Sequence, residues 1–120
     1  MEKPTDIKDR TFEFALRIVD LSDKLPDTVA GKRIADQLLR SGTSVGANIE
    51  EATAASSKTD FAYRVNISLR EARETNYWLR ILKARRIMMK VDVDDLVQES
   101  EELKKILGAI VSKARGKRKS

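Results

Sequence analysis

The sequence of 120 residues contains no cysteine and no histidine. These absences exclude disulfide bonds, Cys/His zinc sites, Cys–His or Ser–His nucleophile pairs and acid–base chemistry by histidine. Any catalysis would have to use carboxylates, lysine, tyrosine or serine. We therefore expect a protein that is not an enzyme and that holds no metal and no cofactor. The lack of disulfides fits the reducing cytoplasm.

Helix breakers are also scarce, with two prolines and five glycines in the chain. The composition is 41% hydrophobic and 36% charged, which is typical of a few long amphipathic helices and not of a disordered chain. The N-terminal sequence MEKPTDIKDRTFEF carries acids and lacks the apolar core of a signal peptide. The longest uncharged run, Ser41 to Ile49, is too short to cross a membrane. We expect a cytoplasmic protein without a membrane partner.

The net charge of +5 is concentrated at the C-terminus. Residues 113–120 hold five basic residues and no acid, and removing these five from the 24 Lys and Arg leaves 19 bases against 19 acids. Residues 1–112 are therefore neutral overall. The sequence predicts one domain over residues 1–115 and a basic, disordered tail over residues 116–120. Five side chains form the candidate phosphate-binding group at this end: Lys113, Arg115, Lys117, Arg118 and Lys119. The alternative is a terminus that only solubilises the protein.

Apolar residues recur at helical spacing along residues 7–25, where Asp6 or Thr5 can cap the helix and Pro26 ends it. One stripe predicts the core face: Ile7, Phe14, Ile18, Leu21 and Leu25. A second stripe of Phe12, Leu16 and Val19 lies 120–180° away at about 100° per residue. This second stripe is either the edge of a wide core face or a contact between subunits.

Three more helices are expected after the first. The second begins near Val29 or Lys32, with Asp27 or Thr28 as its cap, and runs to Ala55. Gly42 and Gly46 within it cost roughly 1 kcal/mol each relative to alanine, so they indicate either close approach of another helix or a break at residues 41–43. The third helix spans about residues 58–86 with Ser57 as its cap, and the fourth spans about residues 92–115, capped by Asp92 and Asp95 and ended by Gly116. Short turns favour an all-α, antiparallel up-down-up-down four-helix bundle, left-handed in its packing.

Polar residues interrupt the apolar stripes of the second and third helices. Glu71 and Glu74 suggest structural pairing, a contact between subunits, or a carboxylate site for a metal or for catalysis, and the absence of histidine favours pairing. We expect these two acids to pair with Arg40 or to accept hydrogen bonds from Asn48, Ser41 or Ser44, and Asn48 to fix the register of the two helices. The predicted polar seam is Arg40, Ser41, Asn48, Glu71 and Glu74. Trp78 is interpreted as core or interface packing.

The outward face of the third helix is basic and contains an aromatic residue. It comprises Arg70, Arg73, Tyr77 and Arg80. Arginines interleaved with an aromatic ring are the pattern that follows phosphates and stacks on bases, so these residues are candidates for nucleic-acid binding. The alternative is a solvated face whose charges are paired along the helix, for example Glu74 with Arg70.

Several segments of the chain resemble a known bacterial family. They are Arg40-Ser41, Ser44-x-x-x-Asn48-Ile49-x-Glu51-Ala52, Phe61 and Glu71-x-x-Glu74-Thr75-x-x-Trp78. In these residues, and over nearly its whole length, the chain resembles the four helix bundle protein family, also called the 23S rRNA intervening-sequence protein family. The resemblance implies a homo-oligomer, commonly a pentamer, with no established enzymatic activity.

Relatives of this family include the accessory variability proteins of diversity-generating retroelements, which bind nucleic acid and a reverse transcriptase. Those proteins are expected to be basic over the whole body, whereas this body is neutral, which argues against the retroelement role. We expect a self-assembling bundle that binds RNA or DNA without sequence preference through the tail and the arginine-rich face. The alternative is a scaffold or accessory subunit, for example of a reverse transcriptase, that binds a protein partner and not nucleic acid.

Overall fold

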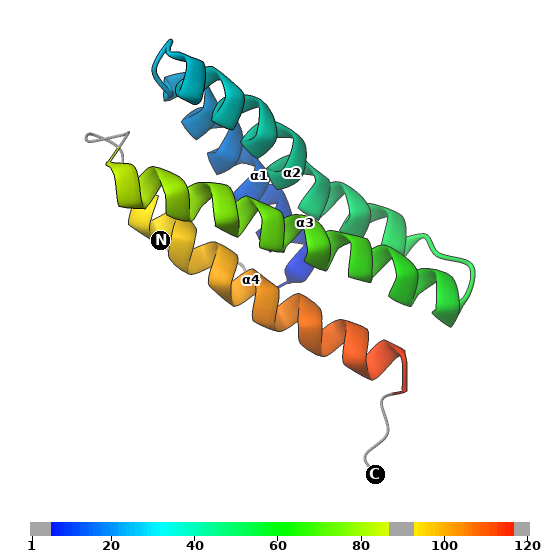
Figure 1. Cartoon of the computed structure of the whole chain (residues 1–120). Coiled ribbons are helices and arrows are strands. Elements are labelled where there is room, and N and C mark those ends of the chain that lie inside the picture. The colour runs from blue at the N-terminus through cyan, green and yellow to red at the C-terminus, as the bar shows by residue number, and fades with distance from the viewer. Residues whose placement is uncertain (1–5, 87–92, 117–120) are drawn as a thin grey trace.

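The computed structural model describes residues 6–86 and 93–116, which form four α-helices in sequence (Figure 1). These are α1 (Ile7–Lys24), α2 (Val29–Thr53), α3 (Lys58–Arg85) and α4 (Val93–Ala114). Each helix packs against the next one in the chain, so the architecture is the predicted all-α up-down bundle. None of the described helices is both long and apolar enough to cross a membrane.

Local side-chain chemistry sets where the described helices begin. The Asp6 carboxylate accepts a hydrogen bond from the amide of Lys8 at 2.7 Å, the Thr28 hydroxyl from Gly31 at 3.0 Å, and the Ser57 hydroxyl from Asp60 at 3.0 Å. Each bond satisfies an amide that has no partner within the first turn of its helix. The predicted caps of the first three helices are thus confirmed, whereas the predicted cap Asp92 lies outside the described residues.

The apolar stripes of the four helices meet in one core. Its fully buried members include Ile18, Leu38, Val45, Leu79 and Leu103. On α3 the buried face is broader than predicted: Ala62, Leu69 and Asn76 join the expected stripe.

Phe61 belongs to the predicted stripe but is only partly buried. Its side chain lines an open pocket between the start of α3 and the end of α4, together with Ile110 and Ala114.

Helix α2 is continuous through both of its internal glycines, so the alternative of a break at residues 41–43 is wrong. A Cβ atom at Gly42 would lie 2.7 Å from Cγ2 of Ile18, and one at Gly46 would lie 3.2 Å from the carbonyl oxygen of Thr11. Both distances are shorter than ordinary van der Waals contact. The two glycines therefore let α1 pack directly against the backbone of α2, which confirms the predicted close approach.

The second apolar stripe of α1 is on the surface. Phe12 is 59% exposed, Leu16 45% and Val19 37%, so its interpretation as the edge of a wide core is wrong for the single chain. Next to it, between α1 and α2, lies a groove of about 370 Å³ that is mostly apolar and is lined by Phe12, Ala15, Thr43, Gly46, Ala47 and Glu50. The alternative of a contact between subunits stays a prediction.

Candidate nucleic-acid interface and polar contacts between helices

A charged cluster joins α2 to α3 at the bundle surface. The Arg40 guanidinium contacts Glu71 at 3.2 Å and also pairs with Glu74, and the indole N–H of Trp78 donates to Glu74 at 3.0 Å. Partial burial opposes ionisation of Glu74, but the hydrogen bonds from Arg40 and Trp78 prevail and lower its pKa below the usual 4.5. The two glutamates therefore make the structural pairing predicted from the sequence. Among the described residues, no group of three or more His, Cys, Asp or Glu side chains is arranged to hold a metal ion.

Beneath this cluster, hydroxyl groups make the buried contacts between α2 and α3. The Thr75 hydroxyl donates to the Ser41 hydroxyl at 2.9 Å, and the Ser68 hydroxyl donates to the backbone carbonyl of Val45 at 2.7 Å. All three hydroxyl side chains are fully buried. Because each bond can form only at one alignment of the two helices, these residues help to set the register.

Asn48 does not make the contact predicted for it. Its side-chain amide donates to the carbonyl of Ser44 at 2.9 Å, which is one turn earlier in the same helix. A hydrogen bond within α2 cannot align α2 with α3. The register function assigned to Asn48 therefore belongs to Ser41, Thr75 and Ser68.

A polar network between α3 and α4 was missed in the sequence. The fully buried Asn76 side chain donates to Ser100 at 2.8 Å and Glu101 at 3.0 Å, and it accepts from the guanidinium of Arg80 at 2.9 Å. The hydrogen bond from Lys104, with that from Asn76, lowers the pKa of Glu101. Asn76 lies beside the apolar stripe, so helical spacing alone gave no signal that it would be buried.

A second cluster, also missed, joins α1 to α4. Arg10 binds Glu99 through two of its nitrogens at 2.7 and 2.9 Å and also pairs with Glu102. The side chains of Arg10 and Glu99 are only 13% and 4% exposed. The hydrogen bond from Arg10 to Glu99 is the main cause of a pKa for Arg10 above its usual value, so the guanidinium stays charged.

The outward residues of α3 form what we call the α3 basic face: Arg70, Arg73, Tyr77 and Arg80, all exposed. The Arg80 guanidinium lies 5.8 Å from the centre of the Tyr77 ring. Arg70 and Arg73 make no ion pair or side-chain hydrogen bond with any other described residue. Glu74 turns toward Arg40, so the alternative pairing of Glu74 with Arg70 is wrong.

Tyr63 continues this face toward the start of α3, because it lies seven residues, about two turns, before Arg70. It is 57% exposed, and the Arg64 guanidinium lies 5.8 Å from the centre of its ring. The sequence analysis did not single out Tyr63. The helical spacing from Tyr63 to Arg70 and Tyr77 is the signal that could have found it.

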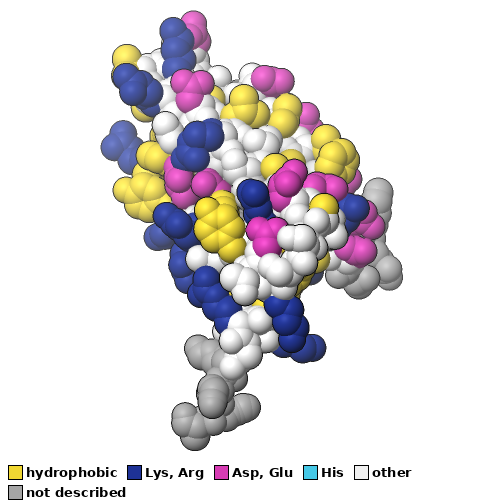
Figure 2. Space-filling view, turned by 90° about the vertical axis from the view of Figure 1, so that its right-hand side faces the viewer, with side chains coloured by type: hydrophobic (Ala, Val, Ile, Leu, Met, Phe, Trp, Pro, Cys, Tyr) yellow, Lys and Arg dark blue, Asp and Glu magenta, His cyan; other side chains and the backbone are white. Residues whose placement is uncertain are grey.

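Of the five side chains in the candidate phosphate-binding group at the C-terminus, Lys113 and Arg115 are described and exposed, and Lys117, Arg118 and Lys119 lie outside the described residues. Figure 2 shows Lys and Arg side chains gathered at this end of the molecule. Lys58 at the start of α3 lines the same pocket as Arg115. The end of α4 and the start of α3 therefore form one basic end of the bundle, which can attract an anion.

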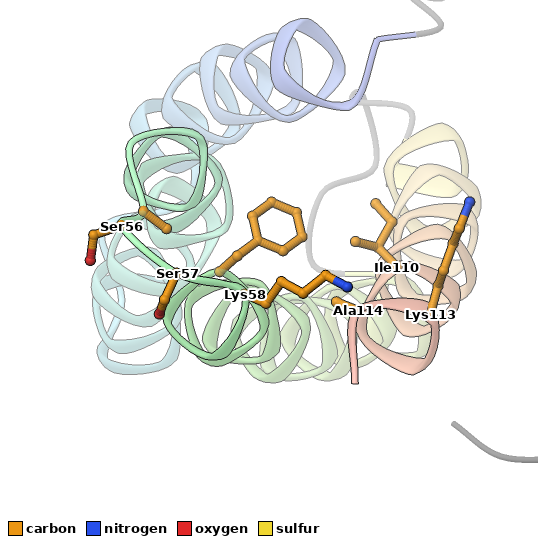
Figure 3. A pocket seen from close by; sticks show the side chains of 8 residues that line it. Ser56, Ser57, Lys58, Ile110, Lys113 and Ala114 are labelled. Carbon is orange, nitrogen blue, oxygen red and sulfur yellow. The ribbon is translucent and has the colours of Figure 1, made fainter. Parts of the chain in front are cut away.

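A larger pocket of about 600 Å³ opens at the same end (Figure 3). Its lining is mainly apolar, and Ile110 points into it while the Lys58 side chain reaches toward Ala114. The full lining is Ala55, Ser56, Ser57, Lys58, Phe61, Ile110, Lys113 and Ala114. It holds no carboxylate. One of its two hydroxyls, that of Ser57, caps α3 by accepting from the amide of Asp60.

These features define a class of protein, the antiparallel four-helix bundle with a basic exposed helix face. The family described as 23S rRNA-intervening sequence protein matches residues 3–109, so the chain belongs to that family. It is also similar to a crystal structure from Bacteroides thetaiotaomicron, described as a protein with unknown function from the S23 ribosomal protein family. The two share 40% identity with a TM-score of 0.78 over 88% of this chain and 95% of the other. No curated protein sequence matches the chain.

Proposed function

We propose that this protein is a non-enzymatic, self-assembling bundle that binds RNA or DNA without sequence preference through the α3 basic face and the C-terminal tail. The observation that carries the proposal is the pair Arg70 and Arg73, whose guanidinium groups are exposed and unpaired within the described residues. Arginine side chains whose charge is not neutralised by a neighbour are available to phosphates. The names of the family and of the similar structure, which refer to 23S rRNA and to the ribosome, are compatible with a nucleic-acid ligand.

Binding would be largely electrostatic, and it should therefore weaken steeply as salt is added. The test measures fluorescence anisotropy of a labelled single-stranded RNA and of a DNA of the same length over a salt series. Replacing Arg70 and Arg73 together by glutamine should weaken binding and flatten the logarithmic salt dependence by about 0.7 for each lost phosphate contact. The control is Lys24→Gln, an exposed base in the last turn of α1, a helix that does not pack against α3.

The C-terminal basic group is tested by truncating the chain after Ser112, which removes all five of its bases. Affinity for both strands should fall at low salt, because several copies of the tail in an oligomer bind together. Unchanged affinity after truncation would show that the tail has no part in binding. Unchanged affinity in the Arg70/Arg73 variant would exclude the α3 basic face.

Self-assembly is proposed to use the exposed stripe of Phe12, Leu16 and Val19. Exposed apolar residues that cluster on one face commonly mark a contact with another protein. A closed ring of five copies of 13.6 kDa would have a mass of about 68 kDa. Light scattering after size exclusion should give this mass for the unaltered chain and a smaller one for Leu16→Glu, and a monomer for the unaltered chain would contradict the proposal.

The same exposed stripe supports a second candidate function, a scaffold or accessory subunit that binds a protein partner and not nucleic acid. Pull-down from lysate with and without nuclease separates the two functions. A partner that is retained after nuclease treatment and lost with Leu16→Glu supports the scaffold. Partners that disappear with nuclease support nucleic-acid binding.

A further inference from the structure

Two exposed tyrosines stand at either end of the unpaired arginines of α3. Tyr63 is 57% exposed and Tyr77 51% exposed, although large aromatic side chains are usually buried. The two residues are separated by close to four turns of about 3.6 residues, so they share one face of the helix at a distance of about 21 Å. Arg70 and Arg73 lie between them on that face.

Each tyrosine ring has a guanidinium beside it. Arg64 lies 5.8 Å from the centre of the Tyr63 ring, and Arg80 lies 5.8 Å from the centre of the Tyr77 ring. These guanidiniums have further partners, since Arg64 is 4.0 Å from Asp60 and Arg80 donates to Asn76. These contacts hold each guanidinium near its ring, and both tyrosine residues remain more than half exposed. A base that stacked on such a ring would bring its own phosphate near a fixed positive charge.

We propose that α3 is a two-platform site for single-stranded nucleic acid, in which bases stack on Tyr63 and Tyr77 while the intervening phosphates contact Arg70 and Arg73. The inference rests on the proposed function and specifies its ligand. A duplex keeps its bases stacked inside the helix and cannot offer them to the tyrosines, whereas a single strand can. At a rise of about 3.4 Å per nucleotide, the 21 Å between the rings corresponds to about six nucleotides, within the range of known single-strand sites.

The decisive comparison uses three probes: a ten-nucleotide oligothymidine, an abasic strand with the same number of phosphates, and a ten-base-pair duplex. Replacing both tyrosines by alanine should lower affinity for oligothymidine at least about five-fold for each lost stacking contact. Affinity for the abasic strand and for the duplex should stay within about two-fold of the unaltered protein, because neither offers a free base. The matched control replaces both tyrosines by phenylalanine, which keeps the ring and should bind oligothymidine like the unaltered protein.

Strand length gives an independent reading. A trinucleotide cannot reach from one tyrosine to the other, so replacing one tyrosine alone should change its affinity less than two-fold. The same single replacement should weaken binding of the ten-nucleotide strand about five-fold. Circular dichroism confirms that each variant is folded, and both positions are exposed.

The outcomes separate this inference from the proposed function. Suppose that Arg70→Gln with Arg73→Gln lowers the affinity for all three probes while the tyrosine variants bind oligothymidine normally. The proposed stacking site would then be refuted, and electrostatic binding would remain supported. Equal affinity of the unaltered protein for oligothymidine and the abasic strand would also overturn the stacking site. If none of the three probes binds at low salt, the proposed function itself fails.

Discussion

Two clusters in this bundle have the same chemistry and different surroundings. In each, an arginine reaches across to two glutamates one turn apart on a neighbouring helix: Arg40 to Glu71 and Glu74, and Arg10 to Glu99 and Glu102. The Arg40 side chain is 50% exposed, whereas Arg10 is 13% exposed and Glu99 4%. Water can replace a lost partner at the first cluster but hardly at the second.

The helix pairs that the clusters join also differ. Helices α2 and α3 pack along much of their length and share the buried contacts of Ser41, Thr75 and Ser68. Helices α1 and α4 contact each other little, and besides the Arg10 cluster they are joined by a distant pair, Arg17 with Asp95 at 3.8 Å. We expect an ion cluster to contribute more to stability where it is buried and where the apolar packing between its two helices is sparse. Four substitutions test it.

Arg10→Met should have the largest effect, a loss of about 3 kcal/mol in the free energy of unfolding. The substitution keeps much of the apolar volume but removes the guanidinium that neutralises the nearly buried Glu99. Urea denaturation followed by circular dichroism measures the change. A loss below about 1 kcal/mol would mean that the two clusters are equivalent and that burial does not distinguish them.

Gly42→Ala should cost about 1–2 kcal/mol, because the new Cβ would lie 2.7 Å from Cγ2 of the fully buried and β-branched Ile18. The test shows how much the stability of α1 in the bundle depends on its packing against α2, since α1 makes few contacts with α4. The control is Gly108→Ala, where nothing lies within 4 Å of the new Cβ and where helix propensity should stabilise by up to about 1 kcal/mol. Equal effects at the two glycines would refute the close approach of α1 to α2.

Arg40→Met should cost less than about 1 kcal/mol, because the pair is half exposed and Glu74 keeps its hydrogen bond from Trp78. The same urea measurement applies. Raising the salt concentration should reduce the difference between Arg40→Met and the unaltered protein, since exposed charges are screened. A loss of stability as large as that of Arg10→Met would refute the expectation that the buried cluster contributes more than the exposed one.

The smallest effect concerns pH. The folded-state pKa of Glu74 lies below its usual 4.5. Ionised Glu74 therefore adds to the free energy of unfolding above about pH 4.5, and this contribution is lost as the pH falls through the lowered pKa. The Glu74→Gln variant should lack this contribution, so its free energy of unfolding should fall less steeply below pH 4.5 than that of the unaltered protein. Parallel curves for the two proteins would show that the Arg40 cluster contributes nothing to acid stability.

Sequence patterns predicted the α2–α3 cluster but not its α1–α4 counterpart. Glu71 and Glu74 flank an apolar stripe, and Arg40 lies on the helix expected to pack beside it, so antiparallel neighbours bring them together. Arg10 also flanks an apolar stripe, one turn from Ile7 and from Phe14. Its partners, however, lie almost ninety residues away on a helix that is not its neighbour in sequence. Spacing within a helix gives the direction of a side chain, but it does not give the offset or rotation of a helix from a distant part of the chain.

Sequence patterns alone predicted the four helices, the Ser57 cap, a choice of two residues for each of the first two caps, and most of the buried stripes. These features depend on helical periodicity and on hydrogen bonds within a few residues, which are local. The packing of the helices was needed to show that Phe12, Leu16 and Val19 are exposed, that Asn76 is buried, and that Tyr63 and Tyr77 are exposed. Exposure depends on where neighbouring helices begin, cross and end, and that is set by packing over the whole bundle.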